Sequence, residues 1–216
     1  MYANRKNRVR EQADAAAFVA AHPFAVLARN GEYGPIVAHV PLVVVRNATG
    51  NLVELIGHVA RANPFHENIS DDGCAVVAVF RGADAYVSPS LYPTKAVSGK
   101  VVPTWNYLAA EACGTLFVDR EPANMRDYLV ALTDEMESHR PMPWAIADAP
   151  EDYLLTMYRG IVGLRIVVSG LVAKRKLDQT KARADFQGVV SAFSASPHPN
   201  EQILASEMTK ESTSPT

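Results

Sequence analysis

The chain has 216 residues, of which 48% are hydrophobic and 20% are charged, and its formal net charge is −2. These values are typical of a globular chain with one sizeable core, and they exclude a broadly basic surface of the kind that binds nucleic acid through its phosphates. The two cysteines, Cys74 and Cys113, lie far apart and outside any CxxC pair, which argues against a zinc site or a disulfide framework.

The N-terminal part of the chain predicts one helix and a β-hairpin. It starts with the polar segment "MYANRKNRVREQ", and no later apolar run is long enough to cross a bilayer, so we expect a cytoplasmic protein. Residues 11–21 predict a helix that Pro23 stops. The runs "FAVLARN" and "IVAHVPLVVV" predict two strands, and the glycines of "GEYG" between them suit a hairpin turn.

The middle of the chain predicts further strands and one short helix. The turn "NATGN" leads into a strand over "LVELIGHV". Asn63 and Pro64 predict a helix start, because asparagine can cap a helix and proline fits its first position. "CAVVAVF", "AYVS" and "VVPTWNYLAAEACGTLFV" predict strands, and Pro103 and Gly114 mark bulges or bends in the last of them.

The last third of the chain changes its hydrophobic period. Apolar residues recur every three or four positions from Met125 to Met136, which predicts an amphipathic helix. A second helix is predicted to open at "DAPE", with Asp148 and Glu151 forming a capping box, and to end at Gly160. "VGLRIVVSGLVAKRKL" returns to the alternation of a strand, and "ADFQGVVSAF" predicts a short helix.

Together these elements predict a mainly β fold with helical additions. Six or more short strands of antiparallel type without a βαβ rhythm favour a small β-barrel over a doubly wound sheet. We expect one domain over residues 1–193. Residues 194–216 are rich in Ser, Thr, Pro and Glu, and we expect them to form a disordered tail.

The segment "LIGHVARANPFHENI" is the first candidate site. A strand that ends at His58, followed by Arg61 and by a helix start at Asn63, would place a guanidinium beside the unpaired N–H groups of Phe65 and His66. Such a corner can hold a phosphate. The alternative is an ordinary strand-to-helix corner, with a solvated Arg61, Asn63 only as a cap and His58 as a packed core imidazole.

Two further segments are candidates for a ligand pocket. His39 and Pro41 lie in an apolar strand, where the imidazole and a backbone carbonyl without its ladder donor can meet the edge of a flat ring. The alternative for His39 is a buried imidazole bonded to backbone. "YVSPSLYPTKAVSGKVVPTWNY" mixes aromatic side chains with amide and ammonium donors, which suits either an apolar pocket with a few polar groups or a dimer interface.

Other functional patterns are weak. The segment "KRKLDQTKAR" is the one local basic patch that could contact DNA, and no helix-turn-helix pair accompanies it. The chain has no GxSxG, HExxH, GxGxxG or GxxxxGK[ST] motif, which argues against hydrolase, metalloprotease and dinucleotide-fold functions.

From Met1 to about Phe193 the chain resembles the PaiB-type FMN-binding negative transcriptional regulators, a family of the FMN-binding split β-barrel group. The resemblance rests on these segments, in this order: "HPFAVLARNGEYGPIVAHVPL", "GHVARANP", "GADAYVSPSLYPTK", "VVPTWNY", "PWAIADAPEDYL", "IVGLRI" and "KRKLDQ".

The resemblance implies a homodimer of split barrels that holds FMN at two sites between the subunits. On this sequence it implies a phosphate segment formed by His58, Val59, Ala60, Arg61 and Asn63, and an isoalloxazine flanked by His39, Val40 and Pro41. Its weaker candidates, some of them reaching across from the partner subunit, are Lys95, Trp105, Asn106, Tyr107, Lys176 and Gln179.

Three residues depart from the family pattern: Leu91 stands where tryptophan is usual, Asp178 where serine is usual, and Thr180 where asparagine is usual. Asp178 would bring a negative charge toward an anionic ligand. The favoured hypothesis is an FMN-binding homodimer with a flavin redox role, such as an FMN-dependent oxidoreductase. The alternatives are a transcriptional regulator that binds DNA and a haem-handling protein in which His39 or His58 binds iron.

Overall fold

The computed structural model describes residues 1–4 and 6–213. The α-helices are α1 (Gln12–Ala21), α2 (Thr94–Ser98), α3 (Met125–Glu137), α4 (Glu151–Tyr158), α5 (Arg183–Ser194) and α6 (Pro199–Thr213). The strands are β1 (Phe24–Gly31), β2 (Gly34–Pro41), β3 (Val43–Arg46), β4 (Leu52–Ala60), β5 (Cys74–Val87), β6 (Thr104–Asp119) and β7 (Ile161–Lys176). Short 3₁₀ turns are η1 (Pro64–His66), η2 (Pro89–Leu91), η3 (Pro122–Asn124) and η4 (Ile146–Asp148).

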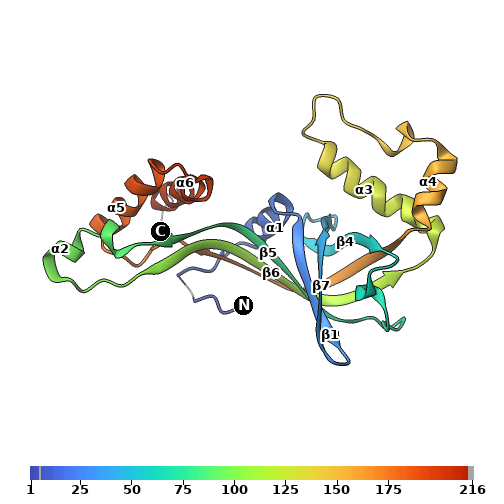
Figure 1. Ribbon diagram of the computed structural model, residues 1–216, viewed down its shortest axis with the longest axis horizontal. Coiled ribbons are helices and arrows are strands. Elements are labelled where there is room, and N and C mark those ends of the chain that lie inside the picture. The colour runs from blue at the N-terminus through green and yellow to red at the C-terminus, as the bar shows by residue number, and fades with distance from the viewer. Residues whose placement is uncertain (5, 214–216) are drawn as a thin grey trace. The chain divides into compact units, whose positions relative to one another are not determined.

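The seven strands form one sheet in the order β2-β1-β5-β6-β7-β4-β3, with helices inserted between them (Figure 1). The pairs β1–β2, β1–β5, β3–β4 and β4–β7 are all antiparallel. This arrangement confirms the predicted mainly β fold with helical additions. No helix formed by the described residues is long and apolar enough to span a membrane.

The chain divides into two compact units. The first, called unit 1, contains residues 1–10, 81–110 and 172–216, and the second, called unit 2, contains residues 11–80 and 111–171. The long strands β5, β6 and β7 contribute residues to both units.

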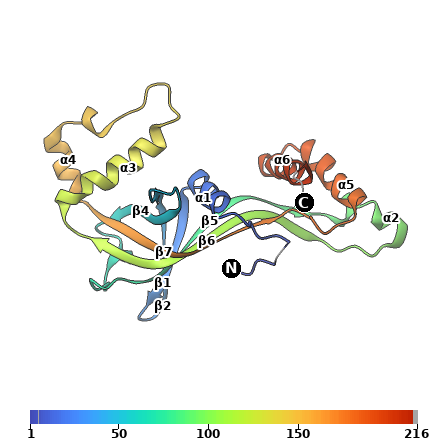
Figure 2. The same ribbon diagram turned by 180° about the vertical axis from the view of Figure 1, so that it is seen from behind.

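Unit 2 contains the hairpin of β1 and β2, the strands β3 and β4, and the helices α1, α3 and α4 (Figures 1 and 2). The hairpin register pairs Gly31 with Gly34, and Gly34 has a φ of +132°, a conformation that glycine adopts readily. The alternating residues Ala25 and Leu27 of β1 are fully buried, as the strand pattern predicts. A second small core forms where α3, η4 and α4 meet, around Met125, Ile146, Leu154 and Tyr158.

Unit 1 contains α2, α5 and α6, and α5 packs against α6 (Figure 2). The structure therefore differs from the expected disordered tail: residues 199–213 form α6, and Leu204, Ala205 and Met208 are buried. The polar composition hid this helix, because three buried side chains on one face are enough to dock it. Residues 214–216 of the predicted tail lie outside the described residues.

Two local predictions need correction. Asp148 does not form a capping box with Glu151; its carboxylate accepts a hydrogen bond from the Ala145 N–H at 2.9 Å and closes η4, while Pro150 stands at the start of α4. The strands predicted at "CAVVAVF" and "AYVS" are one continuous strand, β5. At Gly114 an added Cβ would overlap the carbonyl oxygen of Val167, which explains the glycine at this predicted bend.

Candidate functional site

The corner after β4 fixes the guanidinium of Arg61. Its Nε donates to the carbonyl oxygen of Arg159 at 2.8 Å, and its Nη2 donates to the carbonyl oxygens of Arg120 at 3.1 Å and Ile161 at 3.0 Å. The Arg61 backbone N–H donates to the Gly160 carbonyl at 2.8 Å. The residue is exposed, and within the described part of the chain Nη1 has no hydrogen-bond partner. The side chain is therefore held rigidly while one edge of its fork faces solvent.

The turn after Arg61 differs from the predicted helix start. Asn63 does cap it, but the element is only the 3₁₀ turn η1, and the Asn63 Oδ1 accepts the Phe65 N–H at 2.9 Å. One of the two N–H groups that we expected to be free is thus already bonded. A single turn also has little dipole, so attraction of an anion at this corner depends on Arg61.

His66 and Arg120 brace the same corner. The His66 Nε2 lies 2.9 Å from the carbonyl oxygen of Arg61, and the Arg120 Nη2 donates to the carbonyl oxygen of His66 at 2.9 Å. Sequence reasoning missed Arg120, Arg159 and Ile161 as anchors of Arg61. They act through backbone carbonyls, which carry no side-chain signal, so only the tertiary contact reveals them.

His58 lies on β4 beneath α3. It pairs with Gly163 of β7, and directly opposite residues of an antiparallel pair face the same side of the sheet. A Cβ at Gly163 would meet the Tyr128 ring at 2.8 Å and the Met125 side chain at 3.1 Å, so this side is the one that α3 covers. Burial lowers the pKa of His58, and its Nδ1 is buried without a hydrogen-bond partner in the structure. The imidazole is therefore neutral near pH 7 and packed against the helix.

The end of β4 also meets the end of β2. β3 pairs with β4 only as far as Ile56, whereas β7 pairs with β4 as far as Ala60. Among the described strands, the segment from Gly57 to Ala60, which includes Val59, is therefore paired only with β7. A Cβ at Gly57 would lie 2.6 Å from the carbonyl oxygen of Pro41. Glycine at this position therefore lets the two predicted ligand segments approach each other.

His39 is exposed on β2, which overturns the alternative of a buried imidazole. It pairs across the hairpin with Val26, and its ring stacks near that of Phe24, with centroids 6.1 Å apart and planes at 27°. Val40 is fully buried and Pro41 is partly buried. Of these three residues, His39 presents its side chain to solvent and Val40 packs in the core.

The remaining predicted residues all belong to unit 1. The ammonium group of Lys176 donates to the Thr104 hydroxyl at 2.7 Å and to the Trp105 carbonyl oxygen, and burial lowers its pKa. Trp105 is about half exposed and meets Tyr86 edge to face at 6.1 Å. Tyr107 lies under the Lys174 ammonium group, 5.0 Å from the ring centroid.

Asn106 is fully buried on β6. Its Nδ2 has only the sulfur of Met208 as a partner, at 3.9 Å, and its Oδ1 has no hydrogen-bond partner in the structure. Thioether sulfur is a weak acceptor, so the amide is buried with little compensation. Such a residue calls for an explanation beyond packing.

Gln179 and Lys95 make local contacts. The Gln179 Oε1 accepts the Leu177 N–H at 2.9 Å, and its Nε2 donates to the Arg175 carbonyl, which closes a turn. Lys95 donates to the Ser90 hydroxyl at 3.0 Å. Both side chains therefore support their own loops in this structure.

Asp178 has a structural role in the same turn. It has a φ of +59°, is buried, and its carboxylate accepts the Tyr92 hydroxyl at 3.0 Å. Burial and then the Asp178 charge raise the pKa of Tyr92. The charge that departs from the family pattern is thus directed at a phenol of the same unit.

The predicted basic patch is largely occupied by neighbours. Lys174 is buried against Tyr2 and Tyr107, Arg175 forms an ion pair with Glu207, and the Lys181 ammonium group lies 4.6 Å from the Tyr92 ring centroid. Cations held by aromatic rings and a carboxylate are less available to phosphates than free surface lysines.

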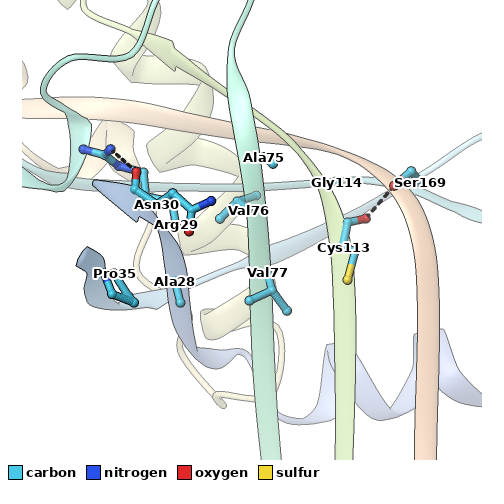
Figure 3. Close-up of a pocket in the computed structure, with 10 residues that line it drawn as sticks. All are labelled: Ala28, Arg29, Asn30, Pro35, Ala75, Val76, Val77, Cys113, Gly114 and Ser169. Atoms are coloured by element: carbon cyan, nitrogen blue, oxygen red, sulfur yellow. Dashed lines mark hydrogen bonds between the residues drawn. The ribbon is translucent and has the colours of Figure 1, made fainter. Parts of the chain in front are cut away.

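A shallow trough of about 500 Å³ crosses the outer face of the sheet in unit 2 (Figure 3). Its lining comes from β1, β2, β5, β6 and β7 and includes Ala28, Pro35, Ala75, Val77 and Cys113. Phe24 and Val37 on the neighbouring strands β1 and β2 are strongly exposed. The trough is therefore lined mainly by apolar residues, with Arg29, Asn30 and Ser169 also in its lining, and it is open in the single chain.

Comparisons with known proteins place the chain in context. Residues 1–170 match the sequence model of the family described as "Putative FMN-binding domain". An uncharacterized protein of Emericella nidulans is 31% identical over 189 residues, which cover 72% of this chain and 74% of that protein. "Protease synthase and sporulation protein PAI 2" of Bacillus subtilis is 29% identical over 192 residues, 88% of each chain.

Among solved structures, the fold is similar to that of the FAD and heme binding protein from Mycobacterium smegmatis. The TM-score is 0.58 at 17% sequence identity, and the match covers 84% of this chain and 79% of that chain. At this identity the likeness concerns the fold, and it confirms the split β-barrel predicted from the sequence.

Proposed function

The chain belongs to the FMN-binding domain family, and from that premise we propose that it binds flavin mononucleotide, with the phosphate at Arg61. The observation that carries the proposal is the guanidinium at the end of β4. Three carbonyl oxygens hold it in place, and its Nη1 edge is free to donate to an anion. A preorganised guanidinium loses little side-chain entropy when it binds a phosphate.

The backbone next to Arg61 is also suited to binding the flavin phosphate. The segment from Gly57 to Ala60 has a strand partner on one side only, and Pro41 approaches it at Gly57. We assign the ring-flanking role to His39 and Pro41, on either side of the buried Val40, and a supporting role to Asn63, whose side chain fixes the turn. His58 contributes a neutral imidazole behind the strand.

The residues in unit 1, Lys95, Trp105, Asn106, Tyr107, Lys176 and Gln179, would complete the site from a second copy of the chain in a homodimer. The apolar trough and the exposed Phe24 and Val37 support such a dimer, because an uncovered apolar sheet face of this kind gains from burial. When bound, the flavin would supply hydride or single-electron transfer, and the protein residues named here would bind and orient it. This assignment is consistent with an FMN-dependent oxidoreductase.

Equilibrium binding of FMN and of riboflavin, which lacks the phosphate, tests the phosphate assignment. We expect Arg61→Ala to weaken FMN binding by about 10- to 100-fold, as for the loss of a charged hydrogen bond, and to leave riboflavin binding almost unchanged. The matched control is Arg46→Ala, since Arg46 is an exposed arginine of the same unit that bonds only the nearby Gly50 carbonyl.

The outcomes separate the parts of the proposal. Equal weakening of FMN and riboflavin would mean that Arg61 acts through the fold of the corner. Failure of the parent protein to bind either flavin would refute the proposed function. Sedimentation equilibrium across a concentration series tests the dimer, and a monomer at all concentrations would contradict it.

The regulator and haem hypotheses stay predictions with simple tests. Specific DNA binding must survive competitor DNA and moderate salt in a gel-shift series. Haem binding must give a Soret shift on titration, and that shift must be lost in a His39→Ala or His58→Ala variant.

A further inference from the structure

The segment from Met125 to Tyr158 is called here the α3–α4 hairpin (Figure 1). It carries an unusual share of exposed apolar side chains. It contains α3, η4, α4 and the loop between the two helices, all within unit 2. Met142 is 89% exposed and Trp144 is 44% exposed. The full set is Met136, Met142, Trp144, Tyr153, Leu155 and Met157.

The loop that carries Met142 and Trp144 is held in place. The backbone N–H of Trp144 donates to a carboxylate oxygen of Glu137 at 3.1 Å, and Arg140 forms an ion pair with the same carboxylate at 3.3 Å. Proline stands on both sides of Met142 in "PMPW", which restricts the backbone. Local hydrogen bonds and prolines therefore hold this loop in a conformation that exposes Met142 and Trp144 to water.

The helices α3 and α4 and the turn η4 all contribute to the small core of Met125, Ile146, Leu154 and Tyr158. Because α3, η4 and α4 pack on one shared core, the exposed side chains belong to a single packed substructure of unit 2. Exposed apolar side chains that are grouped on one part of a protein often mark an interaction site.

The hairpin is rich in acidic residues. The hairpin has seven Asp or Glu residues against two Arg, whereas the whole chain has a net charge of only −2. Asp134, Glu135, Glu151 and Asp152 are all exposed. This excess of carboxylates repels nucleic acid and anionic membranes, and it favours a partner that carries Lys or Arg beside its apolar side chains.

We propose that the α3–α4 hairpin docks a basic amphipathic helix of a partner protein. The apolar face of that helix packs on Trp144 and the methionines, and its cations face the exposed carboxylates. Methionine side chains adapt to varied apolar partners, and tryptophan is enriched among the residues that dominate interface energies. Binding of an amphipathic helix through its apolar face is an established mode of recognition. The proposal is independent of flavin binding.

The test uses the full chain and an 18-residue helical peptide of leucine and lysine, with a matched peptide in which glutamate replaces lysine. The chain has two tryptophans, Trp105 and Trp144, so a Trp105→Phe background makes Trp144 the only reporter. We expect the basic peptide to shift Trp144 emission to the blue, with saturation, and the acidic peptide to leave it unchanged.

Variants then locate the contact, with binding measured by anisotropy of the labelled peptide. We expect Trp144→Ser to weaken binding at least tenfold, and Glu135→Gln with Asp152→Asn to weaken it several-fold and to reduce its dependence on salt. The control is Tyr33→Ser, because Tyr33 is 95% exposed in the β1–β2 turn of the same unit. Thermal melts of each variant verify the fold.

Three results would overturn the proposal: no binding of the basic peptide, equal binding of the acidic peptide, or binding that Trp144→Ser leaves unchanged. A change in the self-association of the chain on Trp144→Ser, without an effect on the peptide, would assign the surface to a second copy instead. Each of these results leaves the flavin proposal untouched, since none involves Arg61.

Discussion

Replacement of the buried amide of Asn106 should stabilise the protein. The Oδ1 of this fully buried side chain has no hydrogen-bond partner in the structure, and Nδ2 has only a sulfur at 3.9 Å. A buried unsatisfied polar group costs about 1–3 kcal/mol. Leucine has the same branching and no polar atoms, so Asn106→Leu removes this cost and adds apolar contact with Met208.

The expected gain is about 1 kcal/mol, because the larger methyl groups of leucine return part of the benefit as crowding. For a chain of this length, 1 kcal/mol corresponds to a rise in Tm of about 2–4 °C. The opposite variant, Asn106→Asp, places an unpaired carboxylate in the same position and should cost about 3 kcal/mol at pH 7. Its deficit should shrink as the pH falls, since the buried carboxyl then takes up a proton.

Calorimetric and urea unfolding of the parent and both variants, at pH 7 and pH 5, measure these effects. A loss of stability in Asn106→Leu, or an Asn106→Asp variant as stable as the parent, would refute the reasoning that this amide is buried without compensation. If Asn106 also contacts the flavin, the stabilised leucine variant should bind FMN more weakly than the parent does. A gain in stability with unchanged FMN binding would remove Asn106 from the flavin site.

Three further predictions follow from other parts of the fold. Burial lowers the pKa of His58 below the ordinary value of 6.5, so the unfolded chain binds a proton at this imidazole more readily than the folded chain does. Stability should therefore fall as the pH drops below about 6.5, and His58→Phe should reduce the slope of Tm against pH measured from pH 7.5 to pH 5. Gly114→Ala should destabilise the protein by about 3 kcal/mol in urea unfolding, because the added Cβ would overlap a β7 carbonyl oxygen. The control Gly170→Ala, whose added Cβ meets open space, should change stability by less than about 0.5 kcal/mol, and similar values for both variants would contradict the close approach of β6 and β7 at Gly114. Cys113 is exposed in the single chain but lines the trough that the proposed dimer would cover, whereas burial raises the pKa of the Cys74 thiol. Ellman's reagent at pH 8 should therefore label one thiol rapidly at concentrations where the chain is monomeric, and Cys113→Ser should abolish that fast phase; a fast phase that persists in this variant would contradict the assignment.

Local sequence patterns predicted much of the fold. The period of apolar residues from Met125 onward predicted α3, and the glycines of "GEYG" predicted the β1–β2 turn, because both signals depend on neighbours in sequence. The same reasoning failed for residues 199–213, since their polar composition gave no sign that three side chains would be buried. It also failed at Asp148, whose carboxylate closes η4 instead of capping α4.

For the candidate site, the sequence by itself determined which residue types follow β4: an arginine, a capping asparagine and a proline that starts the next turn. Only the tertiary structure decided what those residues do. The orientation of Arg61 depends on carbonyl oxygens about 60 to 100 positions away, and the neutrality of His58 depends on a helix packed over Gly163. Contacts with backbone carbonyl oxygens and the burial of a side chain have no local sequence signature. The physical reason is that both arise only when segments distant in sequence meet in the folded chain.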